Sequence, residues 1–296
     1  MTEEPLKILF VINPVSGPKA RLNWEASIRQ YFKPLPHSIE FFLLGGKNDA
    51  GSLAYWIEKI KPDRVIAVGG DGTVSLVAEQ LLGTEIAMGI LPAGSANGMA
   101  KELNIPTNVE GAINVMLNGE IKETDVIRIN DNEICIHLSD IGMNAQIVKY
   151  FEEGQIRGKL AYARMLLKAL WKRHIMRVKI EMNGEITETT AFMVVIANAS
   201  KYGTGAMINP EGNLHDGKFE VVIVRRIAFS EFLKLFLRYR RFDPKKVEVF
   251  QTESVLIDIK RKVHFQIDGE YLGKINRVKA IMEPSRLKLI LLKKNS

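Results

Sequence analysis

Short apolar runs that end in glycine-rich polar turns are the feature that most restricts how this chain can fold. The run 64–68 leads directly into Gly69-Gly70-Asp71-Gly72-Thr73, and the runs 86–91 and 8–12 lead into similar turns at 92–98 and 13–18. Because helical patterns follow these turns, we expect parallel strands that carry the turns at their carboxyl ends. Ligands bind at that edge of such sheets, so one crevice is expected to use all three turns.

The turn at 69–73 has two interpretations. Backbone N–H groups of a glycine-rich turn close readily on a phosphate, while Asp71 can hold a cation or polarise a nucleophile. Gly-Asp-Gly is also a common strand-to-helix turn, in which Thr73 would cap the helix predicted from Val74 to Leu82. The two further turns of the same kind favour the nucleotide site.

Two kinds of hydrophobic pattern divide the chain near Thr124. Up to Gly119 short apolar runs alternate with helical stretches, which predicts an open, mainly parallel α/β domain over residues 1–124. Strand patterns dominate from Lys122 onward, so we expect residues 125–296 to form an antiparallel β-sandwich with one or two inserted helices. The strands expected there are 125–129, 134–138, 176–182, 189–197, 218–224, 255–259, 263–267, 276–281 and 287–292.

The basic character of the chain belongs to its second part. Residues up to Thr124 carry 11 Lys and Arg against 14 Asp and Glu, whereas the rest carries 30 against 20. A helix over 158–173 would place Arg157, Arg164, Lys168 and Lys172 on one side, and the basic stretch 225–246 contains an apolar-rich segment at 229–237. Such faces suit anionic lipid headgroups, although a solvated helix on an ordinary core explains them as well. Because the chain shows no recognition-helix or RNA-stacking motif, we expect no nucleic-acid partner.

Several other chemistries are excluded. Cys135 is the only cysteine, so neither an internal disulfide nor a cysteine-based metal site can form. No stretch reaches the roughly 18 apolar residues of a membrane span, and the first residues lack the charge of a secretory signal. We therefore expect a cytoplasmic protein. The chain has no Walker sequence, so the 69–73 turn would have to hold any triphosphate.

Four motifs, in order, resemble those of the diacylglycerol kinase catalytic family, which includes bacterial lipid kinases, sphingosine kinases and ceramide kinases. They are Asn13-Pro14-x-Ser16-Gly17, Gly69-Gly70-Asp71-Gly72-Thr73, Pro92-x-Gly94-Ser95-x-Asn97 and Asp268-Gly269-Glu270. The resemblance covers nearly the whole chain. It implies the same two-domain plan, with the active site in the cleft between the domains.

The resemblance also implies roles for particular residues in an ATP- and magnesium-dependent lipid kinase. Asp71 would be essential for catalysis, and Glu270 would approach it across the cleft as general base for the lipid hydroxyl. Asp216 resembles a loop residue that binds a second, structural magnesium in bacterial members. The residues implied in nucleotide binding are Asn13, Gly69, Gly70, Asp71, Gly72, Thr73, Gly94, Ser95, Asn97 and Asp125. On local grounds Asp268-Gly269-Glu270 is equally typical of a β-hairpin turn, and Asp125 of a turn before a strand.

Three positions depart from the family's pattern. Most members have Thr at the position of Ser95, Asp at the position of Gly98, and an acid at the position of Asn144. The loss of two carboxylates leaves a catalytically weak lipid- or nucleotide-sensing homologue as an alternative, although the retention of Asp71 and Glu270 argues against it. An NAD kinase shares the Gly-Gly-Asp-Gly turn, but this chain lacks the later Gly-Ser-Thr-Ala-Tyr pattern.

The partners that the resemblance implies are a membrane lipid substrate and an anionic membrane surface. The protein would then be peripheral, at the inner face of the membrane. The sequence leaves a homodimer open and does not identify the lipid. Diacylglycerol, a sphingoid base, ceramide, monoacylglycerol and a polyprenol all offer a primary hydroxyl.

Overall fold

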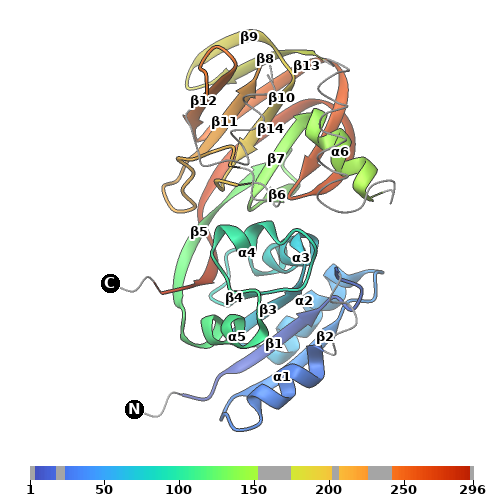
Figure 1. The fold of residues 1–296 in the computed structure, drawn as a ribbon, viewed down its shortest axis with the longest axis vertical. Helices are drawn as coiled ribbons and strands as arrows, with labels where there is room; N and C mark the ends of the chain where they lie inside the picture. The colour runs from blue at the N-terminus through green and yellow to red at the C-terminus, as the bar shows by residue number, and fades with distance from the viewer. Residues whose placement is uncertain (1–3, 18–23, 153–174, 202–206, 226–241, 294–296) are drawn as a thin grey trace. The chain divides into compact units, whose positions relative to one another are not determined.

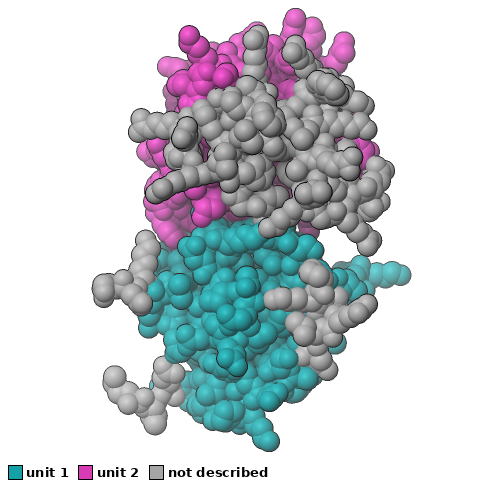
Figure 2. Space-filling model, viewed as in Figure 1, with its two compact units in different colours: residues 1–124, 285–296 teal, residues 125–284 magenta. Residues whose placement is uncertain are grey.

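The computed structural model describes residues 4–17, 24–152, 175–201, 207–225 and 242–293 (Figure 1). The chain forms two compact units, unit 1 with residues 1–124 and 285–296 and unit 2 with residues 125–284 (Figure 2). The first break falls at Thr124, where the sequence pattern changes. The last residues correct the predicted boundary, because the end of β14 (Glu270–Leu291) joins the sheet of unit 1, where Leu289 pairs in parallel with Met88.

Unit 1 is built on a parallel sheet. Its strands lie in the order β2 (Ser38–Leu43), β1 (Lys7–Ile12), β3 (Arg64–Gly69) and β4 (Ala87–Pro92), followed by the end of β14. Every one of these pairings is parallel, which confirms the predicted α/β architecture. The helices of this unit are α1 (Trp24–Phe32), α2 (Asp49–Ile60), α3 (Asp71–Leu81), α4 (Gly98–Glu102) and α5 (Val109–Asn118).

Helices cover both faces of this sheet. Neighbouring residues of a strand point to opposite faces of the sheet. Phe41 and Phe42 of β2 therefore identify the helix that covers each face. The ring of Phe41 stacks on Phe10 and lies under the guanidinium of Arg29 in α1, while the ring of Phe42 packs on Trp56 in α2. A strand covered on both sides reads as a continuous apolar run, which explains the sequence of β3 and β4.

Helix α3 starts earlier than its apolar pattern indicates. Asp71 is its first residue, and Gly70 is the N-cap with an extended backbone and no side-chain capping bond. Thr73 therefore lies inside the first turn of the helix and is buried, so the capping role considered for it does not occur.

Unit 2 is an antiparallel β-sandwich. One run of neighbouring strands has the order β12 (Val247–Thr252), β11 (Phe219–Val224), β10 (Met193–Ala197), β7 (Leu138–Gly142), β13 (Ser254–Ile267) and β14. The other elements are the second half of β5 (Glu120–Ile129), which begins in unit 1, β6 (Glu133–Cys135), α6 (Met143–Glu152), β8 (Met176–Met182) and β9 (Glu185–Ala191), with β8 paired to both β13 and β9. The antiparallel pairings confirm the sandwich expected from the sequence.

The strands of unit 2 differ from the expected ones in length. The single run expected over 189–197 is broken at Phe192 into β9 and β10. Conversely, the runs 255–259 and 263–267 belong to the one strand β13, and the runs 276–281 and 287–292 belong to β14. In β13 the two apolar runs are separated by a bulge, not by a loop, because the register against β14 shifts between Asp258 and Val263.

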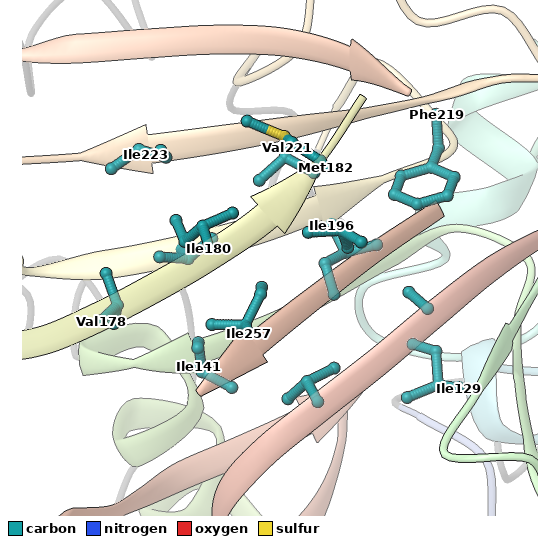
Figure 3. Packing of buried hydrophobic residues seen from close by; sticks show 14 of the residues in the cluster. Ile129, Ile141, Val178, Ile180, Met182, Ile196, Phe219, Val221, Ile223 and Ile257 are labelled. Atoms are coloured by element: carbon teal, nitrogen blue, oxygen red, sulfur yellow. The ribbon is translucent and has the colours of Figure 1, made fainter. Parts of the chain in front are cut away.

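Two apolar clusters hold unit 2 together, one on each face of β10 and β11. Val194 and Ile196 of β10 belong to the first cluster, together with Phe219 and Ile223 of β11 (Figure 3). Val195 of β10 and residues 222 and 224 of β11 belong to the second cluster, where helix α6 contributes Met143 and Ile147. Both faces of these strands are therefore buried, as in β3 and β4 of unit 1.

The helix expected over 158–173 and the apolar-rich segment 229–237 of the second basic stretch lie outside the described residues. Across the part of the chain that the structure describes, no helix combines the length and apolar character needed to cross a membrane.

The return of the chain to unit 1 can be tested at Leu289, whose side chain is 1% exposed. Leu289→Ala leaves a cavity beside β4, and we expect it to lower the free energy of unfolding by about 2–5 kcal/mol in urea titrations. Leu292→Ala is the matched control, because that side chain is 46% exposed; its effect should stay below about 0.5 kcal/mol. Equal effects of the two substitutions would contradict the placement of residue 289 in the sheet.

Candidate functional site

The three glycine-rich turns lie against one another at the carboxyl edge of the parallel sheet. The backbone N–H of Asn13 donates to the carbonyl of Val68 at 3.0 Å. The N–H groups of Ala93 and Gly94 both donate to the carbonyl of Gly69, at 2.9 and 3.1 Å. The turns after β1, β3 and β4 are thus joined through their backbones, as the parallel order of these strands led us to expect.

Glycine is required where these turns touch. A Cβ atom at Gly94 would lie 2.4 Å from the Cα of Gly70, and one at Gly17 would lie 2.6 Å from the carbonyl oxygen of Ala93. Gly17 also has φ +56°, in the left-handed region that favours glycine. Any side chain at Gly17 or Gly94 would push the turns apart.

Asp71 lies at this junction, where β3 passes into helix α3. Its Oδ1 accepts a hydrogen bond from the backbone N–H of Met99 at 3.2 Å, in the first turn of α4. Nearby, Asn97 adopts φ 52° and its Nδ2 donates to the carbonyl of Gly94 at 2.9 Å. The Asp71 carboxylate therefore links two of the turns through Oδ1. Its other oxygen, Oδ2, can then bind a ligand or a metal ion.

Two buried oxygens at these turns have no hydrogen-bond partner among the described residues. They are Oγ1 of Thr73 and Oδ1 of Asn97. A buried polar atom without a partner costs about 1–3 kcal/mol, a cost that a bound ligand or water can offset. Asn13 differs, because its Oδ1 accepts the N–H of Val15 at 3.1 Å and shapes its own turn, and Ser95 is exposed.

The residues at these turns fit a magnesium ion that shares its ligands with phosphate. Magnesium is usually held by one or two carboxylates, with phosphate oxygens and waters completing the octahedron. Asp71 supplies one carboxylate at the turns. The described residues contain no group of three or more His, Cys, Asp or Glu side chains that could hold a metal without a phosphate ligand.

Glu270 follows a two-residue β-hairpin turn in unit 2. Ile267 of β13 pairs with Glu270 of β14, and the turn residues Asp268 and Gly269 have φ 50° and 91°. Positive φ at both central residues is typical of a type I′ turn, which Asp-Gly favours. The hairpin interpretation of this motif is confirmed, and the Glu270 side chain lies exposed at the first position of β14.

Asp268 of the same motif is a buried anchor, a role that the sequence did not indicate. Its Oδ1 accepts the N–H groups of His137 and Leu138, each at 3.0 Å, and its Oδ2 accepts the N–H of Ile136 at 2.9 Å. The thiol of Cys135 lies 3.3 Å from Oδ1. One carboxylate therefore fixes the segment between β6 and β7 to the turn that carries Glu270.

Burial dominates the electrostatics of this anchor. It raises the pKa of Asp268, an effect opposed by the charge of His137 and by the backbone hydrogen bonds. Burial and the adjacent Asp268 carboxylate hold the pKa of the Cys135 thiol well above its usual range. Cys135 is consequently an inert structural thiol rather than a nucleophile.

Asp125 and Asp216 have structural partners within unit 2. Asp125 is buried, and its Oδ2 accepts the N–H of Gly217 at 2.7 Å, so it fixes the loop that contains Asp216. Asp216 accepts the N–H of Lys218 at 3.1 Å and the side-chain amide of Gln251 at 3.3 Å. The nucleotide role of Asp125 and the magnesium role of Asp216 stay predictions.

Asn144 occupies a buried polar network at the start of helix α6. Its Nδ2 donates to Oδ2 of Asp140 at 2.5 Å, and the same oxygen accepts Nε2 of Gln266 at 2.6 Å. An acid at position 144 would place two carboxylates together in the interior, which the amide avoids. The departure at Asn144 is thereby explained by its buried partner.

Two family models together match most of the chain. Residues 7–129 match the diacylglycerol kinase catalytic domain, and residues 139–291 match the YegS C-terminal NAD kinase beta sandwich-like domain. A diacylglycerol kinase of Bacillus subtilis (strain 168) is 23% identical over 273 residues, which is 89% of each chain. The chain therefore belongs to the diacylglycerol kinase catalytic family and is a lipid kinase.

Solved structures share the fold. The crystal structure of a diacylglycerol kinase from Bacillus anthracis str. Sterne matches with a TM-score of 0.73 over 97% of both chains, at 18% identity. An NAD kinase from Archaeoglobus fulgidus, solved in complex with ATP, matches with a TM-score of 0.56 at 11% identity, over 97% of this chain and 94% of that one. The NAD kinase considered from the Gly-Gly-Asp-Gly turn is thus a more distant neighbour in fold.

The anchoring role of Asp268 can be tested with Asp268→Asn. The amide cannot accept the N–H of Ile136 with its nitrogen, so we expect unfolding to become easier by about 1–3 kcal/mol in urea titrations. Asp258→Asn is the control, because its exposed pair with Arg277 should contribute less than about 1 kcal/mol. If the Asp268→Asn protein were as stable as the control, the anchoring role of Asp268 would be wrong.

Proposed function

We propose that the protein transfers the γ-phosphate of ATP to the hydroxyl of a membrane lipid, with magnesium as cofactor. The observation that carries the proposal is the junction of the three turns, where glycine backbones converge on the Asp71 carboxylate. Phosphoryl transfer depends mainly on positioning and on stabilising negative charge, and backbone N–H groups in such turns do both.

The residues of unit 1 would bind the nucleotide. The glycines at 69, 70, 72 and 94 would let N–H groups approach the phosphates, while Thr73, Ser95 and Asn97 offer side-chain hydrogen bonds. The orphaned oxygens of Thr73 and Asn97 support this role, because a ligand or its waters would satisfy them. A magnesium ion bound at Asp71 would spread the charge that develops on the phosphates.

Glu270 would take the proton from the lipid hydroxyl as it attacks. An exposed glutamate at the first position of a strand, directly after a rigid turn, has its backbone fixed and its carboxylate accessible. Asp268 then acts as a positioning residue, since its three backbone hydrogen bonds hold the turn. General-base help of this kind usually contributes about 10²–10⁴ to the rate.

The acceptor is proposed to be a lipid with a primary hydroxyl, such as diacylglycerol or a sphingoid or ceramide-type lipid. The name of the Bacillus subtilis relative favours diacylglycerol. A lipid acceptor requires contact with a membrane, so we propose a peripheral protein at the inner face that meets an anionic surface. We expect no nucleic-acid partner, and the proposal is compatible with either a monomer or a homodimer.

The role of Asp71 can be tested with Asp71→Asn. The asparagine oxygen still accepts the N–H of Met99, so the turn should keep its shape while the charge is lost. We expect lipid phosphorylation, measured as transfer from radiolabelled ATP, to fall by about 10² or more. Glu79→Gln, an exposed change on the same helix α3, should leave the rate unchanged. Retention of more than about a tenth of the wild-type rate by Asp71→Asn would exclude the proposed role.

The role of Glu270 can be separated from nucleotide binding. Glu270→Gln keeps the size of the side chain but cannot take a proton, so turnover should fall by roughly 10²–10⁴. ATP affinity, measured by calorimetry, should hardly change, because the nucleotide is assigned to the turns of unit 1. Glu253→Gln, at an exposed position before β13, is the control. Loss of ATP binding in Glu270→Gln, or full activity, would move the base to another residue, with Asp71 the next candidate.

A further inference from the structure

A positively charged cavity of about 650 Å³ lies in unit 2, and its described lining contains none of the residues assigned to the proposed reaction. Its volume falls within the range of about 300–1,000 Å³ that is usual for small-molecule sites. None of its described lining residues belongs to the glycine-rich turns or to the hairpin at 268–270. The residues that line it are Gly142, Gln146, Ile175, Met176, Arg177, Ile259, Lys260, Arg261, Lys262, Val263, His264 and Lys274.

The cavity forms where strand β13 changes its neighbour. The first half of β13 pairs with β8, up to Ile259 opposite Val178, and its second half pairs with β7, from Phe265 opposite Ile141. β7 and β8 thus diverge at this point, and Gly142 at the end of β7 and Met176 at the start of β8 line the gap.

The bulge in β13 brings charge to this gap. Asp258 pairs with Arg277 of β14 and Val263 pairs with Ile275, so residues 259–262 lie opposite the single residue Asn276. A bulge removes residues from the ladder and re-aims their side chains. Lys260, Arg261 and Lys262 occupy it, and all three are exposed. Arg177 of β8 and Lys274 of β14 add two more cations from neighbouring strands.

These five cations lack acidic partners in the part of the chain that the structure describes. No aspartate or glutamate is among the described residues that line the cavity. Three other arginines among the described residues of unit 2 are paired, Arg128 with Glu283, Arg225 with Glu248 and Arg277 with Asp258. An adjoining cavity that shares Arg177 and Lys260 is also lined by Glu188 and Asp258. The first cavity therefore differs from the adjoining one, because no described acidic residue lines it.

We propose that this cavity binds a phosphate monoester or diester. Cationic side chains that are close together in a concave site repel one another, and a bound anion relieves that repulsion. Lysine and arginine also donate charge-assisted hydrogen bonds to phosphate oxygens. Gln146 and His264 add polar groups, and Ile175, which is 55% exposed, offers apolar contact beside them. A phospholipid headgroup and a soluble phosphate ester both have this chemistry.

The test removes the bulge charges and measures binding without ATP, so its result does not depend on the proposed kinase reaction. The variant is Lys260→Gln with Arg261→Gln and Lys262→Gln. The charge-matched control is Lys33→Gln with Lys47→Gln and Lys293→Gln, all exposed and outside the cavity. Arg177→Gln is a second test on a different strand, and thermal unfolding establishes that each protein is folded.

One arm measures sedimentation with vesicles of equal parts phosphatidylglycerol and phosphatidylcholine, and with phosphatidylcholine alone. The other arm titrates sn-glycerol 3-phosphate and inorganic phosphate by calorimetry. For a headgroup ligand, the bulge variant should bind the anionic vesicles at least about ten-fold more weakly than the control, with Arg177→Gln intermediate. For a soluble ligand, the loss should appear in the calorimetric arm.

Two results would overturn the proposal. Equal weakening in the bulge variant and the charge-matched control would show a response to net charge alone. Unchanged binding of the bulge variant in both arms would show that the cavity holds no phosphate. Either result would leave the assignment of the nucleotide turns intact, because no residue is shared between the two sites.

Discussion

Direct backbone contact between glycine-rich turns is the constraint on which the candidate site of unit 1 depends. Gly94 packs so closely on Gly70 that a Cβ atom would lie 2.4 Å from the neighbouring Cα. This contact brings the turn after β4 onto the turn after β3, and Asp71 then reaches the first turn of α4 with one carboxylate oxygen. The glycines therefore serve the packing of the turns as well as the approach of a phosphate, and the two roles do not compete.

Unit 2 depends on a different kind of interaction, a buried carboxylate that accepts several backbone hydrogen bonds. The oxygens of Asp268 accept the N–H groups of three successive residues, Ile136 to Leu138, so the buried carboxyl group is hydrogen-bonded inside the protein. The same residue forms the first half of the turn before Glu270. Asp268 therefore has a structural role within the Asp268-Gly269-Glu270 motif. Its hydrogen bonds hold the turn that positions the exposed Glu270.

The two architectures and the meeting of the three turns could be predicted from the sequence, because apolar periodicity and glycine-rich strand ends are local signals. The contacts of Asp268 and Asp125 could not, since each partner lies far away in the chain, as Ile136 does from Asp268. The return of residues 285–296 to unit 1 was missed for the same reason: strand β14 is apolar in pattern along its end, and nothing local indicates which sheet it joins. The bulge at 259–262 was likewise hidden between two strand-like runs.

Phosphate transfer from ATP to a lipid hydroxyl can be followed by identifying the product that carries the phosphate. The purified protein would be incubated with γ-labelled ATP, magnesium and either a panel of vesicle-borne lipids or NAD, and the products would be separated and identified by mass spectrometry. We expect label in a lipid phosphomonoester, formed from one or more of the lipids with a primary hydroxyl, and none in the dinucleotide. Label in NADP, with every lipid unlabelled, would contradict it.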